Sequence, residues 1–182
     1  RTLAERFGLP LYDKSILQSA AEARGVDAKT LERYDERPRS PLFYRNIKGF
    51  SNAPEDGVAQ MQFDLLRQHA AAGESFVVLG RCAEEVLADY ECLVSIFIEA
   101  DLDFRIRRTP LPGNEALEFI RRQDRQRRVY HDQHCKNDWG DAQSYDLVIN
   151  SARLGVPGTA DVLEHYIRAR QAHLDDQPAG VV

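Results

Sequence analysis

The sequence predicts an α/β domain in which helices flank a parallel sheet, so that the fold has three layers. Two nearly continuous apolar runs, Phe76–Leu79 and Leu93–Ile98, have the length of strands and are separated by a helix-like segment. Runs without polar alternation are typical of strands that are buried on both faces. A third apolar run, 146–149, follows a strongly charged helical segment. Strands that alternate with helices favour a parallel sheet.

The first third of the chain is predicted to be helical around one short strand. A helix over Arg1–Phe7 ends before a glycine, and Leu9–Tyr12 is a short extended segment. Helices are also expected over 15–24 and from about residue 27. A long mobile loop is expected over 36–57, which contains three prolines and two glycines. Loops of this length often have a function.

Three further helices are predicted in the rest of the chain. The segment 58–72 has apolar residues at helical spacing and ends at a glycine. A short helix is expected over 82–88, between the two apolar runs. The longest helix is expected over 114–131, where charged residues dominate. This charged helix would belong to a lid over about 105–140.

Length and composition indicate one ordinary globular domain. The chain has 182 residues, of which 43% are hydrophobic and 29% charged, so neither a disordered nor a fibrous protein is expected. We expect a single domain over 1–174 and a flexible tail over 175–182. No apolar run approaches the ~20 residues that a membrane span needs, and no signal segment opens the sequence. No membrane partner is therefore expected.

Charge and cysteine content favour a cytoplasmic protein that does not bind nucleic acid. The net charge is -5, which disfavours a nucleic-acid-binding domain. No stacking aromatic residues alternate with the arginines as such a domain would need. The three cysteines are an odd number at irregular spacing, typical of free thiols in a reducing compartment.

Polar residues directly after the predicted strands are the first candidates for a binding site. Ligands of open parallel sheets bind beyond the carboxyl ends of the strands. The candidates at these positions are Asp13, Gly80, Arg81, Asp101–Asp103 and Asn150. Gly80 allows a tight turn, after which Arg81 would present a planar, permanently charged group that suits phosphate. Alternatively, Arg81 pairs with the nearby carboxylate of Glu84 or Glu85.

The densest cluster of cations lies on the charged helix, over residues 121–128. At 3.6 residues per turn, Arg121, Asp124, Arg125 and Arg128 share one face. Like charges so placed repel each other by a few tenths of a kcal/mol per pair, which makes the cluster a candidate anion site. The alternative is a solvated helix face whose arginines pair with scattered surface acids.

A metal site is not predicted at the end of this helix. His131, His134 and Cys135 lie close together in the sequence, but no second group of ligands follows at zinc-finger spacing. The nearby Trp139–Asp141 segment, together with Tyr145, is expected to form a loop that anchors the third strand, with the indole covering the sheet edge. This interpretation requires no ligand.

Five motifs in order resemble the cytidylate kinase-like family along the chain to about residue 167. They are Leu9–Lys14 (LPLYDK), Gly80–Ala83 (GRCA), Asp124–Arg128 (DRQRR), Trp139–Asp141 (WGD) and Tyr145–Ser151 (YDLVINS). This resemblance implies a P-loop fold of the nucleoside monophosphate kinase type. It also implies a phosphotransferase that uses ATP and Mg2+ and has a nucleoside monophosphate as its partner.

The resemblance also assigns roles to individual residues. Arg81 matches an arginine that contacts the monophosphate, although Cys82 stands where true cytidylate kinases have Asp. Asp124 and Arg127 match a pair that holds the acceptor and the migrating phosphoryl group. Arg121 and Arg125 would bind the donor phosphates, and Asp13 would open the acceptor site. Of these residues, Arg81, Asp124, Arg125 and Arg127 are the expected catalytic set.

The resemblance is incomplete at one point. A first strand followed by a glycine-rich phosphate loop should precede the helix over Arg1–Phe7, and neither is present in residues 1–182. The sequence therefore also allows a catalytically inactive nucleotide-binding or protein-interaction module that is derived from the kinase fold.

Overall fold

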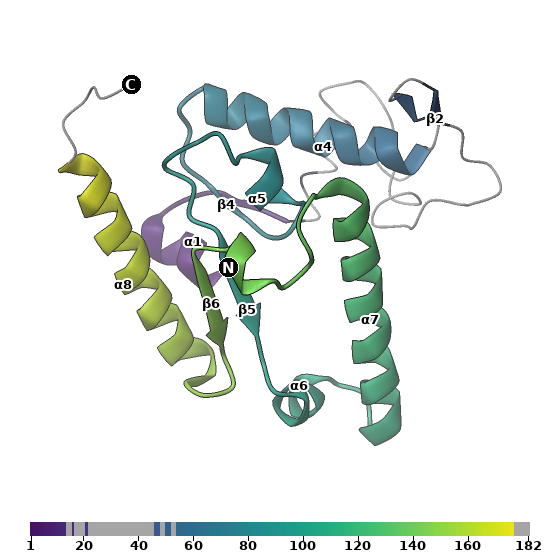
Figure 1. Cartoon of the computed structure of the whole chain (residues 1–182). Helices are drawn as coiled ribbons and strands as arrows, with labels where there is room; N and C mark the ends of the chain where they lie inside the picture. Colours follow the sequence, from purple (N-terminus) through teal and green to yellow (C-terminus); the bar gives the residue numbers. More distant parts are fainter. Residues whose placement is uncertain (14–15, 17–20, 22–45, 48–49, 52–53, 177–182) are drawn as a thin grey trace.

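The computed structural model describes residues 1–13, 16, 21, 46–47, 50–51 and 54–176. The elements in chain order are α1 (Thr2–Phe7), β1 (Leu11–Tyr12), β2 (Asn46–Ile47), β3 (Phe50–Ser51), α4 (Pro54–Ala71), β4 (Val77–Val78), α5 (Ala83–Val86), β5 (Ile96–Glu99), α6 (Leu102–Arg108), α7 (Gly113–His134), the 3-10 helix η1 (Ala142–Ser144), β6 (Leu147–Asn150) and α8 (Gly155–Asp175). In Figure 1, β5 and β6 lie between α8 and α7. The mixture of helices and parallel strands confirms an α/β fold.

The described strands form separate two-stranded sheets. β1 pairs with β4 in parallel, with Leu11 opposite Val77, and β5 pairs with β6 in parallel, with Ile96 opposite Leu147. β2 and β3 form an antiparallel pair. Parallel pairing across intervening helices agrees with the prediction. A single sheet in three layers is not seen in the described part of the chain.

Burial of the apolar strands on both faces is a wrong prediction. Leu79, directly after β4, is 67% exposed, and Ile98 of β5 is 52% exposed. β4 pairs only with β1 and β5 only with β6 among the described strands, so each has one unpaired edge. The apolar runs predict a more extensive sheet than the described strands form.

The predicted loop over 36–57 is partly wrong. Pro54 and Gly57 belong to the first turn of α4, where a proline is well accommodated because its missing N–H would have no helical partner. The β2–β3 pair also falls within this range. The rest of the range lies outside the described residues, as do most of the helix predicted over 15–24 and the helix expected from about residue 27.

Two helices were not predicted, and both matter for the fold. α6 follows β5 directly, and α8 packs on α1 near the amino terminus. Arg6 of α1 donates hydrogen bonds to Asp161 at 2.7 Å and to Glu164 at 3.0 Å. The Arg168 guanidinium lies 4.8 Å from the ring centre of Phe7. α8 continues to Asp175, and the predicted tail beyond 176 lies outside the described residues.

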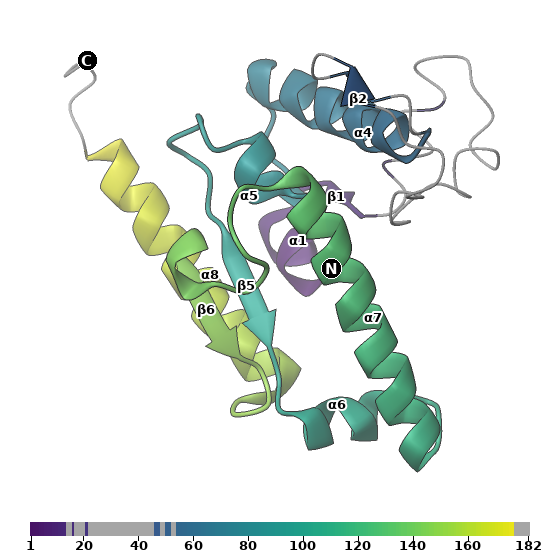
Figure 2. The same cartoon turned by 45° about the vertical axis from the view of Figure 1, so that its right-hand side comes forward.

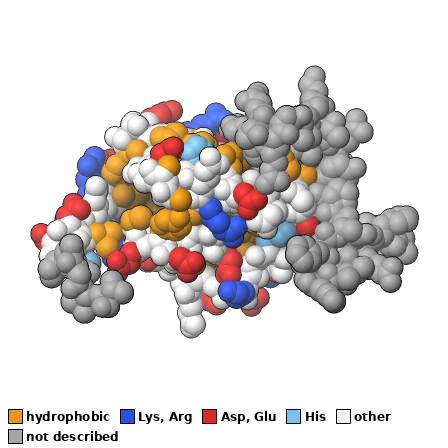
Figure 3. Space-filling view, turned by 90° about the horizontal axis from the view of Figure 1, so that it is seen from above, with side chains coloured by type: hydrophobic (Ala, Val, Ile, Leu, Met, Phe, Trp, Pro, Cys, Tyr) orange, Lys and Arg blue, Asp and Glu red, His pale blue; other side chains and the backbone are white. Residues whose placement is uncertain are grey.

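The largest buried cluster lies where α4, α5 and the end of α7 meet. Its buried members are Ile16, Ala59, Phe63, Leu66, Cys82, Val86, Leu87 and Tyr130. On the face seen from above, an apolar area is visible, and basic side chains are scattered among acidic ones (Figure 3). Among the described helices, none combines the length and the apolar character that crossing a membrane requires.

Candidate functional site

The carboxyl ends of β5 and β6 are joined by side-chain hydrogen bonds. Asn150 donates from Nδ2 to Oδ1 of Asp101 at 2.9 Å. Ser151, which is buried, donates from its hydroxyl to the Glu99 carbonyl, also at 2.9 Å. Parallel pairing thus brings together two of the candidates that follow the predicted strands. Asp101 also lies 3.5 Å from the guanidinium of Arg153.

An open hollow of about 360 Å3 lies beside this edge, between α6 and α7. It is lined by Ala100, Phe104, Arg105, Arg108, Thr109, Phe119, Ile120, Gln123, Arg127 and Ser151. Pockets for small ligands typically measure about 300–1,000 Å3, so the hollow has the size of a small-ligand site. Three of its lining residues are arginines, and no acidic residue is among them. The hollow therefore suits an anion.

Arg105 and Asp124 form a two-pronged ion pair between α6 and α7. The two guanidinium NH groups of Arg105 donate to the two carboxylate oxygens of Asp124, at 2.8 and 2.6 Å. Both side chains are about one third exposed. Such bidentate pairs hold a fixed geometry as well as adding energy. Asp124 therefore holds an arginine of the hollow in place.

The other arginines of α7 divide between the hollow and the surface. Arg127 lines the hollow, whereas Arg121 and Arg125 are exposed and are not among its lining residues. Arg128 lies over the ring of Trp139 at 5.8 Å, a cation–π contact worth about 0.5–1 kcal/mol at an exposed site. The predicted face of four residues thus serves several different contacts.

Arg81 and Asp13 lie at the carboxyl ends of β4 and β1, the second parallel pair. Gly80, Arg81 and Cys82 have φ angles of 73°, 65° and 52°, so three consecutive residues are left-handed. Left-handed non-glycine residues cost roughly 1–3 kcal/mol each and occur preferentially at functional sites. The Arg81 side chain is nearly fully buried, and Asp13 lies 3.8 Å from Arg1.

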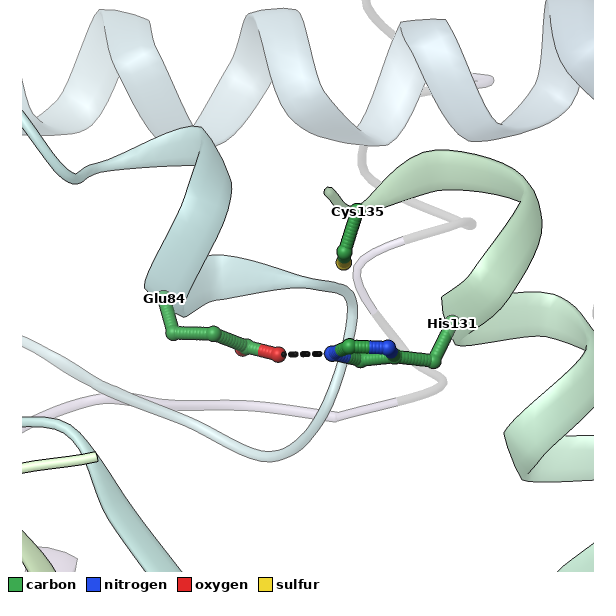
Figure 4. Close-up of side chains that lie close together, drawn as sticks. All are labelled: Glu84, His131 and Cys135. Carbon is green, nitrogen blue, oxygen red and sulfur yellow. Dashed lines mark hydrogen bonds and ion pairs between the residues drawn. The ribbon is translucent and has the colours of Figure 1, made fainter. Parts of the chain in front are cut away.

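The two carboxylates that were alternatives for pairing with Arg81 face other cations. Glu85 lies 3.1 Å from the ammonium of Lys136, and Nε2 of His131 donates to a carboxylate oxygen of Glu84 at 2.8 Å. Figure 4 shows Glu84, His131 and the thiol of Cys135 together, brought from α5 and from the end of α7.

The pKa values of His131 and Cys135 are both raised, but for different reasons. Burial opposes a charge on His131, but hydrogen bonds with Cys135 and Glu84 outweigh it and raise the pKa of His131 to about 10. A hydrogen bond with Cys82, together with burial, raises the pKa of the Cys135 thiol far above its ordinary value. His134, which is close to Cys135 in the sequence, packs against Phe63 and Tyr130.

The loop after α7 anchors the sheet, as predicted. Phe97 of β5 packs against Trp139 and Tyr145, with ring centres 5.4 and 5.1 Å away. Gly140 has φ 82°, and a Cβ there would lie 3.1 Å from the Phe97 ring. Burial raises the pKa of Tyr145 to about 12. This packing needs no ligand.

A family model described as the cytidylate kinase-like family matches residues 1–153. The chain belongs to the cytidylate kinase-like family. A crystal structure of an uncharacterized protein from Eubacterium ventriosum ATCC 27560 is similar, with 30% sequence identity and a TM-score of 0.70. The similarity covers 92% of this chain and 88% of that chain. A search of curated proteins found no match.

All candidate residues of this cytidylate kinase-like chain lie within the matched range. Sequence analysis missed Arg105 and Arg108, because the helix that carries them was not predicted. A signal was present: these arginines lie in the segment that follows the strand ending at Glu99, at the edge where ligands of parallel sheets bind. Glu84 was considered only as a partner of Arg81, because its proximity to His131 depends on tertiary packing.

Proposed function

We propose that this chain is a phosphotransferase that moves the terminal phosphoryl group of ATP to a nucleoside monophosphate. The observation that carries the proposal is the hollow lined by Arg105, Arg108 and Arg127 at the carboxyl ends of β5 and β6. Guanidinium groups keep their charge at all relevant pH values and donate in a planar fork that matches phosphate oxygens. Membership of the cytidylate kinase-like family supports the same activity.

The two parallel edges supply different parts of the proposed reaction. Asp13 and Arg81 would hold the acceptor monophosphate at the β1–β4 edge. Arg127 would contact the migrating phosphoryl group. Asp124 would hold Arg105 in its position in the hollow and would also face the acceptor. The exposed guanidinium groups of Arg121 and Arg125 would reach the donor phosphates when α7 closes as a lid.

The chemistry of the transfer requires charge and position rather than a covalent intermediate. An oxygen of the acceptor phosphate forms a bond to the terminal phosphorus of ATP as the bond from that phosphorus to the leaving ADP oxygen breaks. Negative charge spreads over the migrating group, and arginine side chains neutralise it. Lid closure would exclude water that could otherwise accept the phosphoryl group.

Mg2+ fits this site only together with phosphate oxygens. Asp101 is occupied by Asn150 and Arg153, and both oxygens of Asp124 are occupied by Arg105. Mg2+ usually binds through one or two carboxylates plus substrate phosphates, so the ion would arrive with ATP. When bound, it supplies additional neutralisation of the phosphate charge.

We also propose that a further parallel strand lies between β4 and β5 and leads into a phosphate loop. Each of these strands has one unpaired edge among the described residues, and each exposes an apolar side chain, Leu79 at 67% and Ile98 at 52%. One strand that pairs with β4 on one side and with β5 on the other would cover these side chains. It would also give hydrogen-bond partners to the unpaired backbone N–H and C=O groups of the two edges. It would join the two parallel pairs into one sheet of a three-layer P-loop fold.

The test is ATP-dependent phosphorylation of a panel of nucleoside monophosphates by the full-length protein. We expect turnover of at least one monophosphate, and a pyrimidine is not required because Cys82 replaces the Asp that accompanies cytidine specificity. Loss of turnover in both Arg81→Ala and Arg127→Ala, with the fold intact, would support the residue roles. Arg67→Ala on α4, which removes an exposed arginine that does not line the hollow, is the matched control.

The alternative is a catalytically inactive nucleotide-binding or protein-interaction module. The same assay separates the two: ATP binding without turnover of any monophosphate would favour the module. Absence of both ATP binding and turnover would exclude the phosphotransferase.

A further inference from the structure

Glu84, His131 and Cys135 bring three different donor atoms together; His131 is buried, the other two are half-buried, and none of the three lines the arginine hollow. One carboxylate oxygen, one imidazole nitrogen and the sulfur all lie within 4.8 Å of one another. Figure 4 shows the three side chains directed toward a common point from α5 and from the end of α7. We propose that this cluster binds a divalent transition metal, and that its ligand set selects Zn2+.

The arrangement differs from that of a nucleophilic relay. In a Cys–His–acid relay, the thiol and the carboxylate approach opposite nitrogens of the ring. Glu84 lies 2.8 Å from Nε2 of His131, whereas the buried Nδ1 has no hydrogen-bond partner in the described part of the chain. In Figure 4 the Cys135 sulfur lies near the ring edge that faces Glu84. The three donors therefore converge on one point.

The distances fit a metal after a small contraction. Zn2+ binds nitrogen and oxygen at about 2.0–2.2 Å and sulfur at about 2.3 Å, so the ligand atoms of a tetrahedral site lie roughly 3.3–3.8 Å apart. The ligand atoms here lie within 4.8 Å of one another. They would have to approach by about 1 Å, which rotation of the side chains can supply. Thiolate with imidazole favours zinc over the hard cations Mg2+ and Ca2+.

The surroundings supply the outer contacts that a metal site needs. His131 is 4% exposed, which keeps the imidazole away from competing water. An oxygen of Asp132 lies 3.8 Å from Nδ1, close enough to accept its proton after a small shift, as carboxylates do for zinc-bound histidines. Cys82 forms a hydrogen bond with the Cys135 thiol, and binding of the metal would displace the thiol proton.

The proposed metal would link two parts of the phosphotransfer site. Glu84 belongs to α5, which begins directly after the left-handed turn containing Arg81. His131 and Cys135 lie at the end of α7, whose earlier turns carry Arg127. A metal would therefore fix the Arg81 turn against the proposed lid helix. The three side chains would leave the fourth tetrahedral position to water. The metal proposal does not depend on the phosphotransferase proposal.

The experiment is a titration of the metal-free 182-residue chain with Co2+, followed by displacement with Zn2+. Co2+ occupies zinc sites and reports a thiolate ligand by a sulfur-to-metal charge-transfer band. We expect one equivalent of Co2+ to produce this band together with tetrahedral visible absorption, and Zn2+ to abolish both. The metals alone are the probes, so failure of phosphotransfer has no effect on the result.

Cys135→Ser removes the sulfur ligand, and Cys92→Ser is the matched control because Cys92 is an exposed thiol outside the cluster. We expect Cys135→Ser to abolish the charge-transfer band and to weaken Co2+ binding by more than the ~10–100-fold that loss of an outer contact costs. Cys92→Ser should bind as the parent chain does. Glu84→Gln, which removes a half-buried ligand, should weaken binding without abolishing the band. Absence of a one-equivalent band, or equal Co2+ affinity in the two serine variants, would overturn the proposal.

Discussion

The middle and the last turn of α7 carry charged side chains in different surroundings. The helix has 22 residues and is therefore about 33 Å long. Its middle turns border an open hollow lined by Arg127 of α7 and by Arg105 and Arg108 of α6, without a lining acid; we call this part the open end of α7 and the last turn the buried end. At its last turn, His131 is buried and lies 2.8 Å from the Glu84 carboxylate.

The difference follows from the cost of burying charge. An isolated ion is strongly disfavoured in a protein interior, so a buried cation must have a partner within the fold. In the open hollow, Arg105 is paired with Asp124, whereas Arg108 and Arg127 are exposed to water and remain available for an external anion. We infer that the open end of α7 serves a ligand, whereas the buried end serves the structure.

The largest effect that would test this comparison is loss of activity in Arg127→Ala. We expect kcat for phosphoryl transfer to fall by about 10²–10³, the usual result of removing one preorganised donor from a transition state. The thermal unfolding temperature should change little, because Arg127 is exposed. Steady-state kinetics with the best monophosphate and thermal denaturation of the same samples measure the two quantities.

Arg67→Ala provides the control, since Arg67 is also exposed but pairs only weakly with Asp64 one helical turn away. Its kcat should equal that of the parent. Equal activity of Arg127→Ala and Arg67→Ala would mean that the hollow does not contact the reacting phosphate.

At the buried end, His131→Gln should destabilise the fold by about 3 kcal/mol. The substitution leaves Glu84 without its cation, and breaking a buried ion pair costs about 3–5 kcal/mol. The lower value applies because the Glu84 side chain is still 18% exposed. Urea denaturation in the presence of a chelator measures the free energy of unfolding without a metal contribution.

The double variant His131→Gln/Glu84→Gln tests the cause of this loss. Since neither residue of the neutral pair carries a charge, its destabilisation should be smaller than the sum of the two single losses. Additive losses would show that the residues contribute by packing alone.

The sequence predicted those elements whose signal is local. The helix before Gly8, the parallel strands around Val77 and Ile96, and the charged helix over α7 follow from apolar runs, periodicity and terminating residues. The wrong predictions concern positions where tertiary packing determines the secondary structure. Pro54 ends loops and begins helices with equal ease, and only the packing of α4 distinguishes the two.

The candidate site was predictable to a similar extent. The rule that ligands bind at strand ends located Asp101, Asn150 and Arg81, and the resemblance to the family located Arg127. Arg105 was missed because its role depends on a fork with Asp124 from another helix, 19 residues away in the chain. The convergence of Glu84 on His131 spans 47 residues, and no periodic pattern in the sequence encodes it.

A smaller effect is expected at the loop that follows the buried end. Gly140→Ala should destabilise the fold by about 1–2 kcal/mol, because the residue is left-handed and its new Cβ would meet the Phe97 ring at 3.1 Å. Gly57→Ala is the opposite control: Gly57 is helical and exposed with no neighbour within 4 Å, so alanine should stabilise by about 0.5–1 kcal/mol. At about 2–4 °C per kcal/mol, thermal denaturation resolves both signs. Equal shifts in the same direction would contradict the assigned role of the loop.

The smallest expected effect concerns the fork between α6 and α7 at the open end. A double-mutant cycle with Arg105→Ala and Asp124→Asn should give a coupling of about 0.5–1 kcal/mol in the free energy of unfolding. The fork is bidentate, but both side chains are about one third exposed, so water weakens the attraction. The coupling should therefore be well below that of His131 with Glu84, measured in the same way. A coupling at Arg105–Asp124 as large as that of the buried pair would contradict the comparison, because the open end would then contribute as much to the fold as the buried end does.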